Sequence, residues 1–430
     1  MTGVEIQDQD GVRRVPLAAR VLPARVHYGW WIAIGSLALL LVTVGVGYYG
    51  LAVFLRPLQD DHGWSNGVVS GATGLYFTIS GLTGAVIGPY IDRNGPLGLM
   101  TAGTVVLGAA VAAVGFVETI WQLYLVYVLM AIGFGMAASI GVNAMLARWF
   151  IHKRARAMSI AFTGVSLGGV VLAPLGTALI DSGGIRLAAI GMGALVVAVA
   201  MPIVRGLLVW DPAELGLEPD AGAPPPAQTR GALGHEVQHR VWRRAEAART
   251  VSFWALLSGF ILVLLAQTGF LLHQISFLED RLGSRQTASF ALSVTALGSI
   301  LARLAVGAVA DRLDKRWLTV ALFTIQATSV LLVVHVENVV LTYVLVLVVG
   351  FTIGNIYMMQ TLLTSEIFGI VSLGTILGML SLSSQLGSGI GPALIGLIED
   401  RTGDYTAAFT LTAVITYVAA ACIVLARPPR

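Results

Sequence analysis

Twelve long apolar runs constrain this chain more than any other feature of its sequence. A helix needs about 20 mostly apolar residues to cross a ~30 Å hydrocarbon layer, and each run reaches that length. The runs are continuous and do not alternate with polar residues, which excludes a membrane barrel. They lie at 30–56, 67–90, 97–117, 120–147, 157–180, 187–209, 251–278, 286–310, 317–335, 339–365, 371–398 and 405–426. The sequence therefore predicts an all-α protein with twelve transmembrane helices in a lipid bilayer.

Composition supports this interpretation and excludes other classes. Of 430 residues, 56% are hydrophobic and 11% are charged, against about 25% charged in typical soluble domains. A soluble enzyme is thereby ruled out. A net charge of +3 is small for a nucleic-acid-binding chain of this length. Cys422 is the single cysteine, which rules out a disulfide scaffold. No cluster of Cys, His and acidic residues lies within the runs, so we expect neither a metal nor a cofactor.

The distribution of basic residues predicts the orientation. With the N-terminus inside, 20 of the 26 Lys and Arg residues fall on inner segments and five on outer loops, as the positive-inside rule requires. We therefore expect a multi-pass protein of the cell membrane with a cytoplasmic tail at 1–29 and a cytoplasmic C-terminus at 427–430. We also expect it to act as a monomer.

A hydrophilic stretch at 210–250 divides the runs six and six. It is predicted to be a cytoplasmic linker between an N-terminal bundle at 30–209 and a C-terminal bundle at 251–426. Its second part is equally compatible with a helix on the membrane surface.

The two halves repeat each other. The segment GPYIDRNG at 88–95 matches GAVADRLD at 307–314, 219 residues further on, and the acidic loop 58–65 matches 277–284 at the same offset. Internal repeats in helical membrane proteins are typical of alternating-access transporters, whose substrate site lies between the halves at the midplane.

The repeated Asp-Arg turns suggest a local mechanism. Each closes a short inner turn, where a carboxylate can hold a neighbouring helix end and an arginine can bridge to a partner span. A simple topology-fixing turn is the alternative. The residues of these motifs are Gly88, Asp92 and Arg93, then Gly307, Asp311 and Arg312.

These motifs resemble those of the major facilitator superfamily, in which Gly-x-x-x-Asp-Arg marks the turn between helices 2 and 3. Two further stretches resemble the monocarboxylate transporter and oxalate/formate antiporter group. They are Tyr28-Gly29-Trp30-Trp31, which opens the first helix, and Trp149-Phe150-x-His152-Lys153-Arg154, which opens the fifth. The resemblance implies two pseudo-symmetric six-helix bundles.

Arg303 is the candidate substrate-binding residue. It lies near the middle of the eighth run, and no Asp or Glu lies deep in any run. A charge at mid-bilayer costs at least about 2.5–3.5 kcal/mol, and arginine stays protonated. A substrate carboxylate, which can pair with guanidinium through two hydrogen bonds, would satisfy this charge. The alternative is that Arg303 snorkels to the surface or pairs with backbone carbonyls.

Ser299 shares a helix face with Arg303, and this face is small or polar along its length. Monocarboxylate transporters carry Asp-x-x-x-Arg on this helix, so Ser299 stands where the resemblance predicts an acid. A single cationic group is neutralised by a monoanion, whereas a dianion leaves excess negative charge. The sequence therefore favours a monocarboxylate over oxalate.

Other polar residues within the runs are weaker candidates. Asn143, Ser384 and Gln385 could donate hydrogen bonds to a substrate or could join helices. Tyr357 resembles a substrate-side tyrosine of bacterial lactate-type carriers, or it packs. His273 is the one histidine well inside a run. Histidine is a common proton carrier, although a structural histidine is the alternative.

These observations predict a secondary transporter, not an enzyme, that moves a small lactate- or pyruvate-like carboxylate. Proton symport is the first expectation and exchange against a counter-anion the second. A drug exporter on the same fold, or a receptor without transport, would be the alternative classes.

Overall fold

The computed structural model describes residues 26–64, 66–222, 241–283 and 285–428. Most of the 1–29 tail and the middle of the 210–250 linker therefore lie outside the described residues. The helices of the first half are α2 (Tyr28–Gly47), α3 (Tyr49–His62), α4 (Asn66–Asn94), α5 (Leu97–Val114), α6 (Ile120–Ala137), α7 (Ser139–Trp149) and α8 (Arg154–Gly206). α8 contains two spans, because Gly183 and Gly184 leave helical geometry in its middle.

The linker region contributes two short 3-10 helices, η1 (Pro212–Leu215) and η2 (Pro219–Gly222), and the single turn α10 (Arg244–Ala247). The second half contains α11 (Val251–Leu282), α12 (Arg285–Val309), η3 (Ala310–Arg312), α13 (Lys315–His335), α14 (Val339–Ile353), α15 (Ile356–Phe368), α16 (Leu373–Thr402) and α17 (Thr406–Val424).

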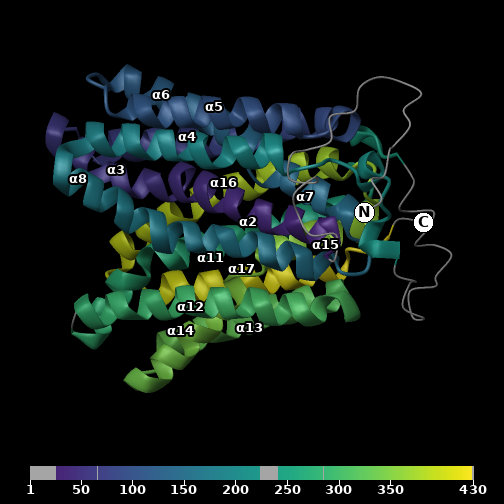
Figure 1. Ribbon diagram of the computed structural model, residues 1–430. Coiled ribbons are helices and arrows are strands. Elements are labelled where there is room, and N and C mark those ends of the chain that lie inside the picture. The colour runs from purple at the N-terminus through teal and green to yellow at the C-terminus, as the bar shows by residue number, and fades with distance from the viewer. Residues whose placement is uncertain (1–25, 65, 223–240, 284, 429–430) are drawn as a thin grey trace.

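Ten helical segments of the described chain are long and apolar enough to cross a membrane. The second span inside α8 and the 30-residue α16 complete the predicted twelve. The helices run side by side along one direction (Figure 1). An even number of spans brings the start of α2 and the end of α17 to one face, called here the termini face. The linker elements also lie there, at the right-hand end of Figure 1.

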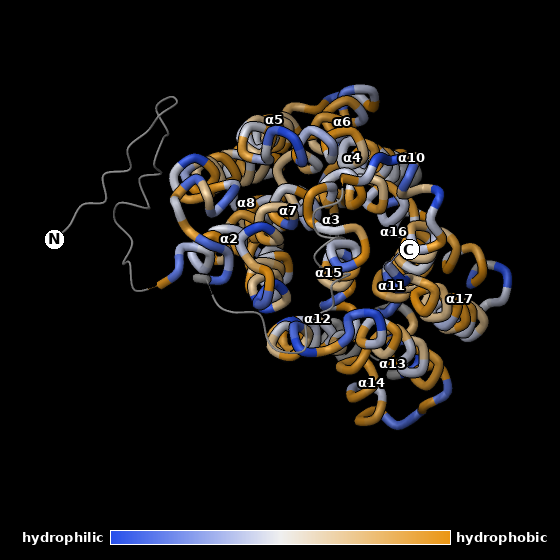
Figure 2. The backbone as a smooth tube through the Cα atoms, turned by 90° about the vertical axis from the view of Figure 1, so that its right-hand side faces the viewer, coloured by the Kyte–Doolittle hydropathy of each residue, from blue (hydrophilic) through white to orange (hydrophobic). Residues whose placement is uncertain are grey.

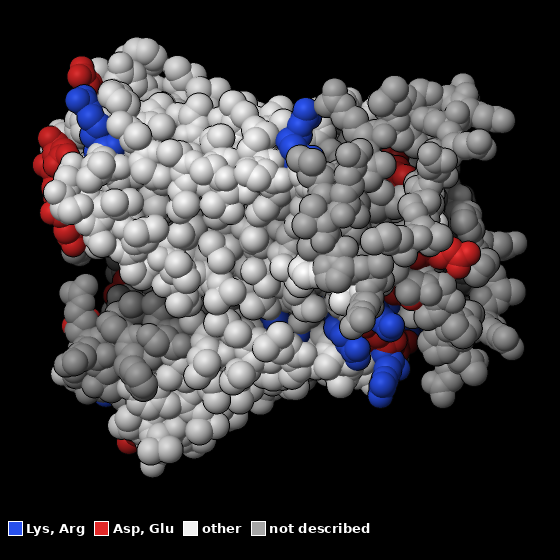
Figure 3. Space-filling view, viewed as in Figure 1, with Lys and Arg blue, Asp and Glu red and all other residues white. Residues whose placement is uncertain are grey.

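The helices form two groups, as expected for two pseudo-symmetric bundles. Looking onto the termini face, Figure 2 places α2 and α4–α8 on one side and α11–α14 and α17 on the other. Charged side chains gather at the two ends of the molecule, with a largely uncharged band between them (Figure 3). Such a band fits the hydrocarbon layer of a bilayer.

Three of the predicted spans are broken, although the sequence predicted continuous helices. Span 1 breaks at Tyr48 and span 4 at Ala138, between α6 and α7. Span 10 breaks at Gly354 and Asn355, between α14 and α15. A break within a membrane frees backbone polar groups, which must then be satisfied by protein or must line a water-filled cavity. The breaks therefore mark positions where backbone groups become available to side chains.

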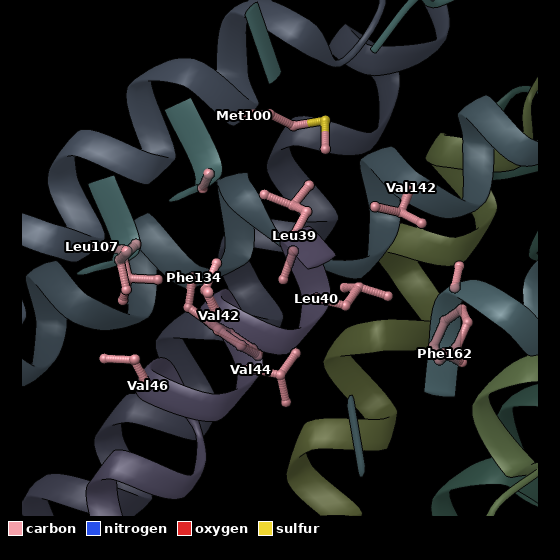
Figure 4. Close-up of a cluster of buried hydrophobic side chains, with 14 of the residues drawn as sticks. Leu39, Leu40, Val42, Val44, Val46, Met100, Leu107, Phe134, Val142 and Phe162 are labelled. Atoms are coloured by element: carbon pink, nitrogen blue, oxygen red, sulfur yellow. The ribbon is translucent and has the colours of Figure 1, made fainter. Parts of the chain in front are cut away.

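α2 packs against α3, α5, α6, α7 and, above all, α8 in the first bundle. Its Leu39, Val42 and Val46 are buried and belong to one cluster with Leu107 of α5 and Phe134 of α6, shown in Figure 4. This packing holds α2 against α5 and α6.

Two seams join the bundles, one between α4 and α16 and the other between α8 and α12. Glycines allow the backbones to touch in the first seam, since a methyl group at Gly88 would overlap the carbonyl oxygen of Gly374. In the second seam, a methyl group at Gly307 would overlap the side chain of Ser159. Both glycines lie near the termini face, so both seams are tightly closed there.

Candidate functional site

Arg303 lies in α12 and is buried, with 6% of its surface exposed. Its Nε donates a hydrogen bond of 2.7 Å to the carbonyl oxygen of Gly354, and its Nη1 donates to the hydroxyl of Ser166 in α8. Both acceptors are neutral. No described acidic residue forms an ion pair with Arg303, so its positive charge has no counter-charge within the described chain.

The break in span 10 creates the first of these contacts. Gly354 caps α14, and the backbone of α12 approaches it so closely that a methyl group at Gly354 would lie 2.8 Å from the Ser299 hydroxyl oxygen. Ser299 is itself buried. Arg303 and Ser299 therefore both face the break of span 10, and the sequence correctly placed them on one helix face.

A cavity of about 820 Å³ opens between α8 and α12. Along α12 it ends at Ile300, and along α8 it ends at Gly169. These positions are three residues, or about 4.5 Å of helix, from Arg303 and Ser166. Arg303 and Ser166 do not line the cavity themselves, and the bond between them lies about one helical turn beyond its inner end. The lining residues are otherwise mostly small or aliphatic, with Asp181 towards the far end of the span.

Below Arg303 the same seam is sealed towards the termini face. The Ser159 hydroxyl donates to the carbonyl oxygen of Arg303 itself. The Asp311 carboxylate then accepts hydrogen bonds from the backbone N–H groups of Ala155 (2.7 Å) and Arg156 (3.2 Å) at the start of α8. The seam is thus open on one side of Arg303 and closed on the other.

Three tyrosines lie near the site, Tyr48 and Tyr49 from the first bundle and Tyr357 from the second. Tyr49, at the break of span 1, lies close enough to Arg303 to interact with it electrostatically, and the ring of Tyr48 lies 5.2 Å from that of Tyr49. Tyr357 of α15 faces Tyr48 and Tyr49, and its hydroxyl lies close to that of Ser388 in α16. The predicted Tyr357 and Arg303 thus share one neighbour, Tyr49.

The remaining predicted residues lie in other contacts. Gln385 donates a long hydrogen bond of 3.4 Å to Ser80 in the α4–α16 seam, and Ser384 accepts one of 2.9 Å from Gln360. Asn143 is buried in α7, where its Oδ1 has no hydrogen-bond partner among the described residues. No contact joins any of these three to Arg303 within the part of the chain that the structure describes.

His273 is bound to helices of its own bundle. Its Nε2 lies 3.0 Å from the carbonyl oxygen of Pro392 in α16, and its Nδ1 lies 3.4 Å from the hydroxyl of Tyr405. The Tyr405 ring also packs against Phe409. These contacts place His273 beside an aromatic cluster rather than beside a group that touches Arg303.

The two Asp-Arg turns bind the opposite bundle. Asp92 accepts hydrogen bonds from the backbone N–H groups of Gly374 (2.8 Å) and Thr375 (2.7 Å) and from the Thr375 hydroxyl (2.5 Å) at the start of α16. Asp311 does the same at the start of α8. Both carboxylates lie at helix N-termini, where negative charge is stabilised. Arg93 and Arg312 are exposed, and neither makes a hydrogen bond within the described chain.

Sequence reasoning missed Ser166 and Tyr49 as neighbours of Arg303, and Tyr48 as the tyrosine beside Tyr49. The adjacent tyrosines in an otherwise apolar run were a usable signal, because two hydroxyls within a membrane need partners. A single serine in a glycine-rich span carried no such signal. Its importance depends on the crossing of α8 and α12, which the sequence does not specify.

Comparison with known families gives matches over nearly the whole chain. The model of the Major Facilitator Superfamily matches residues 36–283 and 268–430. The chain is 26% identical to "Monocarboxylate transporter 13" of Bos taurus over 332 residues, covering 76% of this chain and 73% of that protein. It is 23% identical to the "Oxalate:formate antiporter" of Oxalobacter formigenes over 393 residues, covering 91% and 89%.

Solved structures share the fold at lower identity. The human organic anion transporter MFSD10 aligns with a TM-score of 0.69 at 16% identity, covering 94% of this chain and all of that chain. FucP, solved in the outward conformation, aligns with a TM-score of 0.68 at 15% identity, covering 93% of this chain and all of that chain.

Proposed function

Because the chain belongs to the major facilitator superfamily and is a membrane transporter rather than an enzyme, we propose that it carries a small monocarboxylate across the cell membrane. The observation that carries this proposal is the state of Arg303, a buried guanidinium bonded to neutral oxygens and set one helical turn beneath an open cavity. A carboxylate entering that cavity would reach an uncompensated positive charge.

The charge balance favours a monoanion. Arg303 has no cationic neighbour in the contacts described above, and Asp181 lines the far end of the cavity. A dicarboxylate would leave one negative charge without a partner. A compact monoanion such as lactate or pyruvate would leave the site neutral, with Ser299 and Tyr357 as the proposed hydrogen-bond donors to its second oxygen or its hydroxyl.

Transport would proceed by alternating access. We take the termini face as cytoplasmic, following the positive-inside count, so the structure corresponds to a state open to the outside. Carboxylate binding to Arg303 would compete with Ser166 for Nη1 and so loosen the contact between α8 and α12. The Asp92 and Asp311 contacts would then separate as the inner face opens.

Proton symport is the coupling we propose. The relative named as an oxalate:formate antiporter makes anion exchange the second candidate. A symporter moves its substrate faster when protons flow in the same direction, whereas an exchanger depends on anion loaded on the opposite side. The functional unit would be a monomer, since each chain contains both bundles and both seams.

Uptake into proteoliposomes tests the proposal. Lactate, pyruvate, acetate, formate and oxalate would be compared with and without a pH gradient, on wild type, Arg303→Gln and Arg303→Lys, with the exposed Arg401→Gln as the matched control. We expect monocarboxylate uptake to fall about 100-fold or more in Arg303→Gln, since losing a buried ion pair costs about 3–5 kcal/mol, and to fall less in Arg303→Lys. Unchanged uptake in Arg303→Gln would remove the site assignment. If the pH gradient does not change uptake but anion loaded inside the proteoliposomes stimulates it, the coupling is exchange and not proton symport.

A further inference from the structure

The linker contains a buried acid that neither the repeat nor the substrate site explains. Asp220 lies in η2, is 3% exposed and adopts a positive φ of 54°, so this non-glycine residue lies in the left-handed region. A backbone conformation of this kind costs free energy and persists only where surrounding contacts hold it. The hydrogen bonds that the Asp220 carboxylate accepts therefore hold this residue in its left-handed conformation.

The Asp220 carboxylate binds the backbone that leads into α8. It accepts hydrogen bonds from the N–H groups of Ile151 (2.8 Å), His152 and Lys153 (3.4 Å). Directly after them, the N–H groups of Ala155 and Arg156 donate to Asp311 of the second bundle. Two carboxylates, one from the linker and one from the opposite bundle, thus bind nearly every N–H group from 151 to 156.

Arg154 lies between these two acids. It is buried, and its guanidinium donates to Ser365 of α15 (2.9 Å) and to the carbonyl oxygens of Phe150 and Ala147. Asp220 and Asp311 are near enough to interact with it electrostatically. The start of α8 is therefore the place where the first bundle, the linker and the second bundle meet.

The linker itself is anchored to the first bundle. Arg148 forms an ion pair of 2.9 Å with Asp211, the indole of Trp149 donates to the carbonyl oxygen of Val209, and Tyr28 donates to that of Leu207. These bonds fix the segment that leads to Asp220 independently of the second bundle. Asp220 can therefore hold residues 151–153 in place whether or not Asp311 is engaged.

We infer that Asp220 is a positioning residue for transport: it holds residues 151–153 so that the N–H groups of Ala155 and Arg156 face Asp311, and it thereby favours closure of the termini face. This inference depends on the alternating-access part of the proposed function and not on the identity of the substrate. Without Asp220, three donors lose their acceptor, residues 151–153 gain freedom, and Asp311 must order them each time the face closes.

The test measures which face is open, in the absence of substrate. In a Cys422→Ser background, one reporter is Thr177→Cys, which lines the cavity. The other is Met358→Cys, at a position that is 1% exposed in a cluster that joins both bundles. Alkylation of the first reports the state seen here, and alkylation of the second reports an open termini face. The change under study is Asp220→Asn, because asparagine tolerates the left-handed region while it removes the charge and replaces one acceptor oxygen with an NH2 donor.

We expect Asp220→Asn to raise the labelling of the Met358→Cys reporter relative to the Thr177→Cys reporter by about three- to tenfold, in the range expected when charge-assisted hydrogen bonds are weakened. In an Asp311→Asn background the same substitution should have little further effect, because Asp220 acts through the contact that Asp311 makes. In an Asp92→Asn background, which weakens the other seam, the full effect should remain. Glu218→Gln, an exposed linker acid, serves as the matched control.

Two results would overturn the inference. Asp220→Asn could shift the labelling ratio equally in the Asp311→Asn background, or it could lower thermal stability without shifting the ratio in any background. If the chain does not work by alternating access, the result differs from both of these. In that case neither Asp92→Asn nor Asp311→Asn would alter the labelling ratio.

Discussion

The two seams between the bundles share their ends but differ in their middle. Each has an acid at the termini face that binds the start of a helix in the opposite bundle, and each has a glycine that admits close backbone contact. At the centre, the repeat offset of 219 residues aligns Ser80 and Gly84 of α4 with Ser299 and Arg303 of α12. The serine is present in both seams, whereas the arginine is present in one.

This difference separates two tasks. In the α4–α16 seam, Ser80 binds Gln385, and a methyl group at Gly84 would lie 2.7 Å from Ile140 and 3.3 Å from Ser381. The position that carries charge in one seam is thus filled by close packing in the other. The closing contacts follow the repeat, while the substrate chemistry we propose belongs to the α8–α12 seam alone.

Among the substitutions that compare the two seams, we expect Gly88→Ala to have the largest effect on uptake. Its methyl group would overlap a backbone carbonyl oxygen that cannot turn aside, so α4 and α16 could not close. We expect the initial rate of uptake to fall about 30-fold, in keeping with a cost of about 2 kcal/mol for an overpacked contact. Gly98→Ala is the control, because nothing lies within 4 Å of the position its methyl group would take.

The equivalent change in the other seam should behave differently. The methyl group of Gly307→Ala would overlap the side chain of Ser159 rather than backbone, so adding Ser159→Gly should restore much of the lost uptake. No side-chain substitution of this kind is available to rescue Gly88→Ala. If a second, side-chain substitution restored uptake equally well in Gly88→Ala and in Gly307→Ala, the proposed difference in how the two seams close would be contradicted.

Much of this architecture could be predicted from the sequence, because lipid imposes simple rules. Span number follows from length and hydropathy, and the two pseudo-symmetric bundles follow from the repeat. The isolated charge of Arg303 was visible for the same reason, since no acid shares the apolar runs. Ser299 followed from helical periodicity alone.

What the sequence did not reveal depends on how helices cross and where they break. Ser166 became relevant only once α8 was seen to lie against α12, and Gly354 only once span 10 was seen to break. Asp220 lies in a segment with the composition of a flexible linker, so its burial was unexpected. Each of these contacts joins residues at least 50 positions apart, beyond the reach of local patterns.

Ser299→Asp should produce the next largest effect. It would place a carboxylate on the helix face of Arg303, next to Gly354, and give the charge an internal partner that the described chain now lacks. We expect uptake at neutral pH to fall about tenfold, since a competing interaction of about 1.4 kcal/mol weakens binding by that factor. Acidification should restore part of it, because a protonated aspartic acid no longer competes with the substrate.

Ser299→Asn is the matched control for size and polarity without charge. Uptake in Ser299→Asn should depend on pH as in wild type. An unchanged rate in Ser299→Asp at neutral pH would contradict the expected competition between the new carboxylate and the transported anion. Ser80→Ala, at the equivalent position of the other seam, should change uptake less than twofold.

The two acids should differ in a smaller but measurable way. Asp92 accepts three hydrogen bonds from the start of α16 and Asp311 accepts two from the start of α8. We expect Asp92→Asn to raise the accessibility of the termini face about fivefold and Asp311→Asn about threefold, since each such bond contributes about 1 kcal/mol or less when only its charge is removed. Labelling of the Met358→Cys reporter measures both. A larger effect of Asp311→Asn would reverse the proposed order of the two contacts.

His273→Gln is expected to have the smallest effect. The ring nitrogens of His273 lie within hydrogen-bond distance of Pro392 and Tyr405, both in the second bundle, so the side chain joins α11 to α16 and α17 without touching either seam. Glutamine can replace one of these bonds, and we expect a loss of about 1 kcal/mol in stability with the stimulation of uptake by a pH gradient unchanged within twofold. Uptake would be measured with and without the gradient, together with the melting temperature. If the gradient loses its effect while the melting temperature holds, His273 carries the proton, and the coupling site lies apart from both seams.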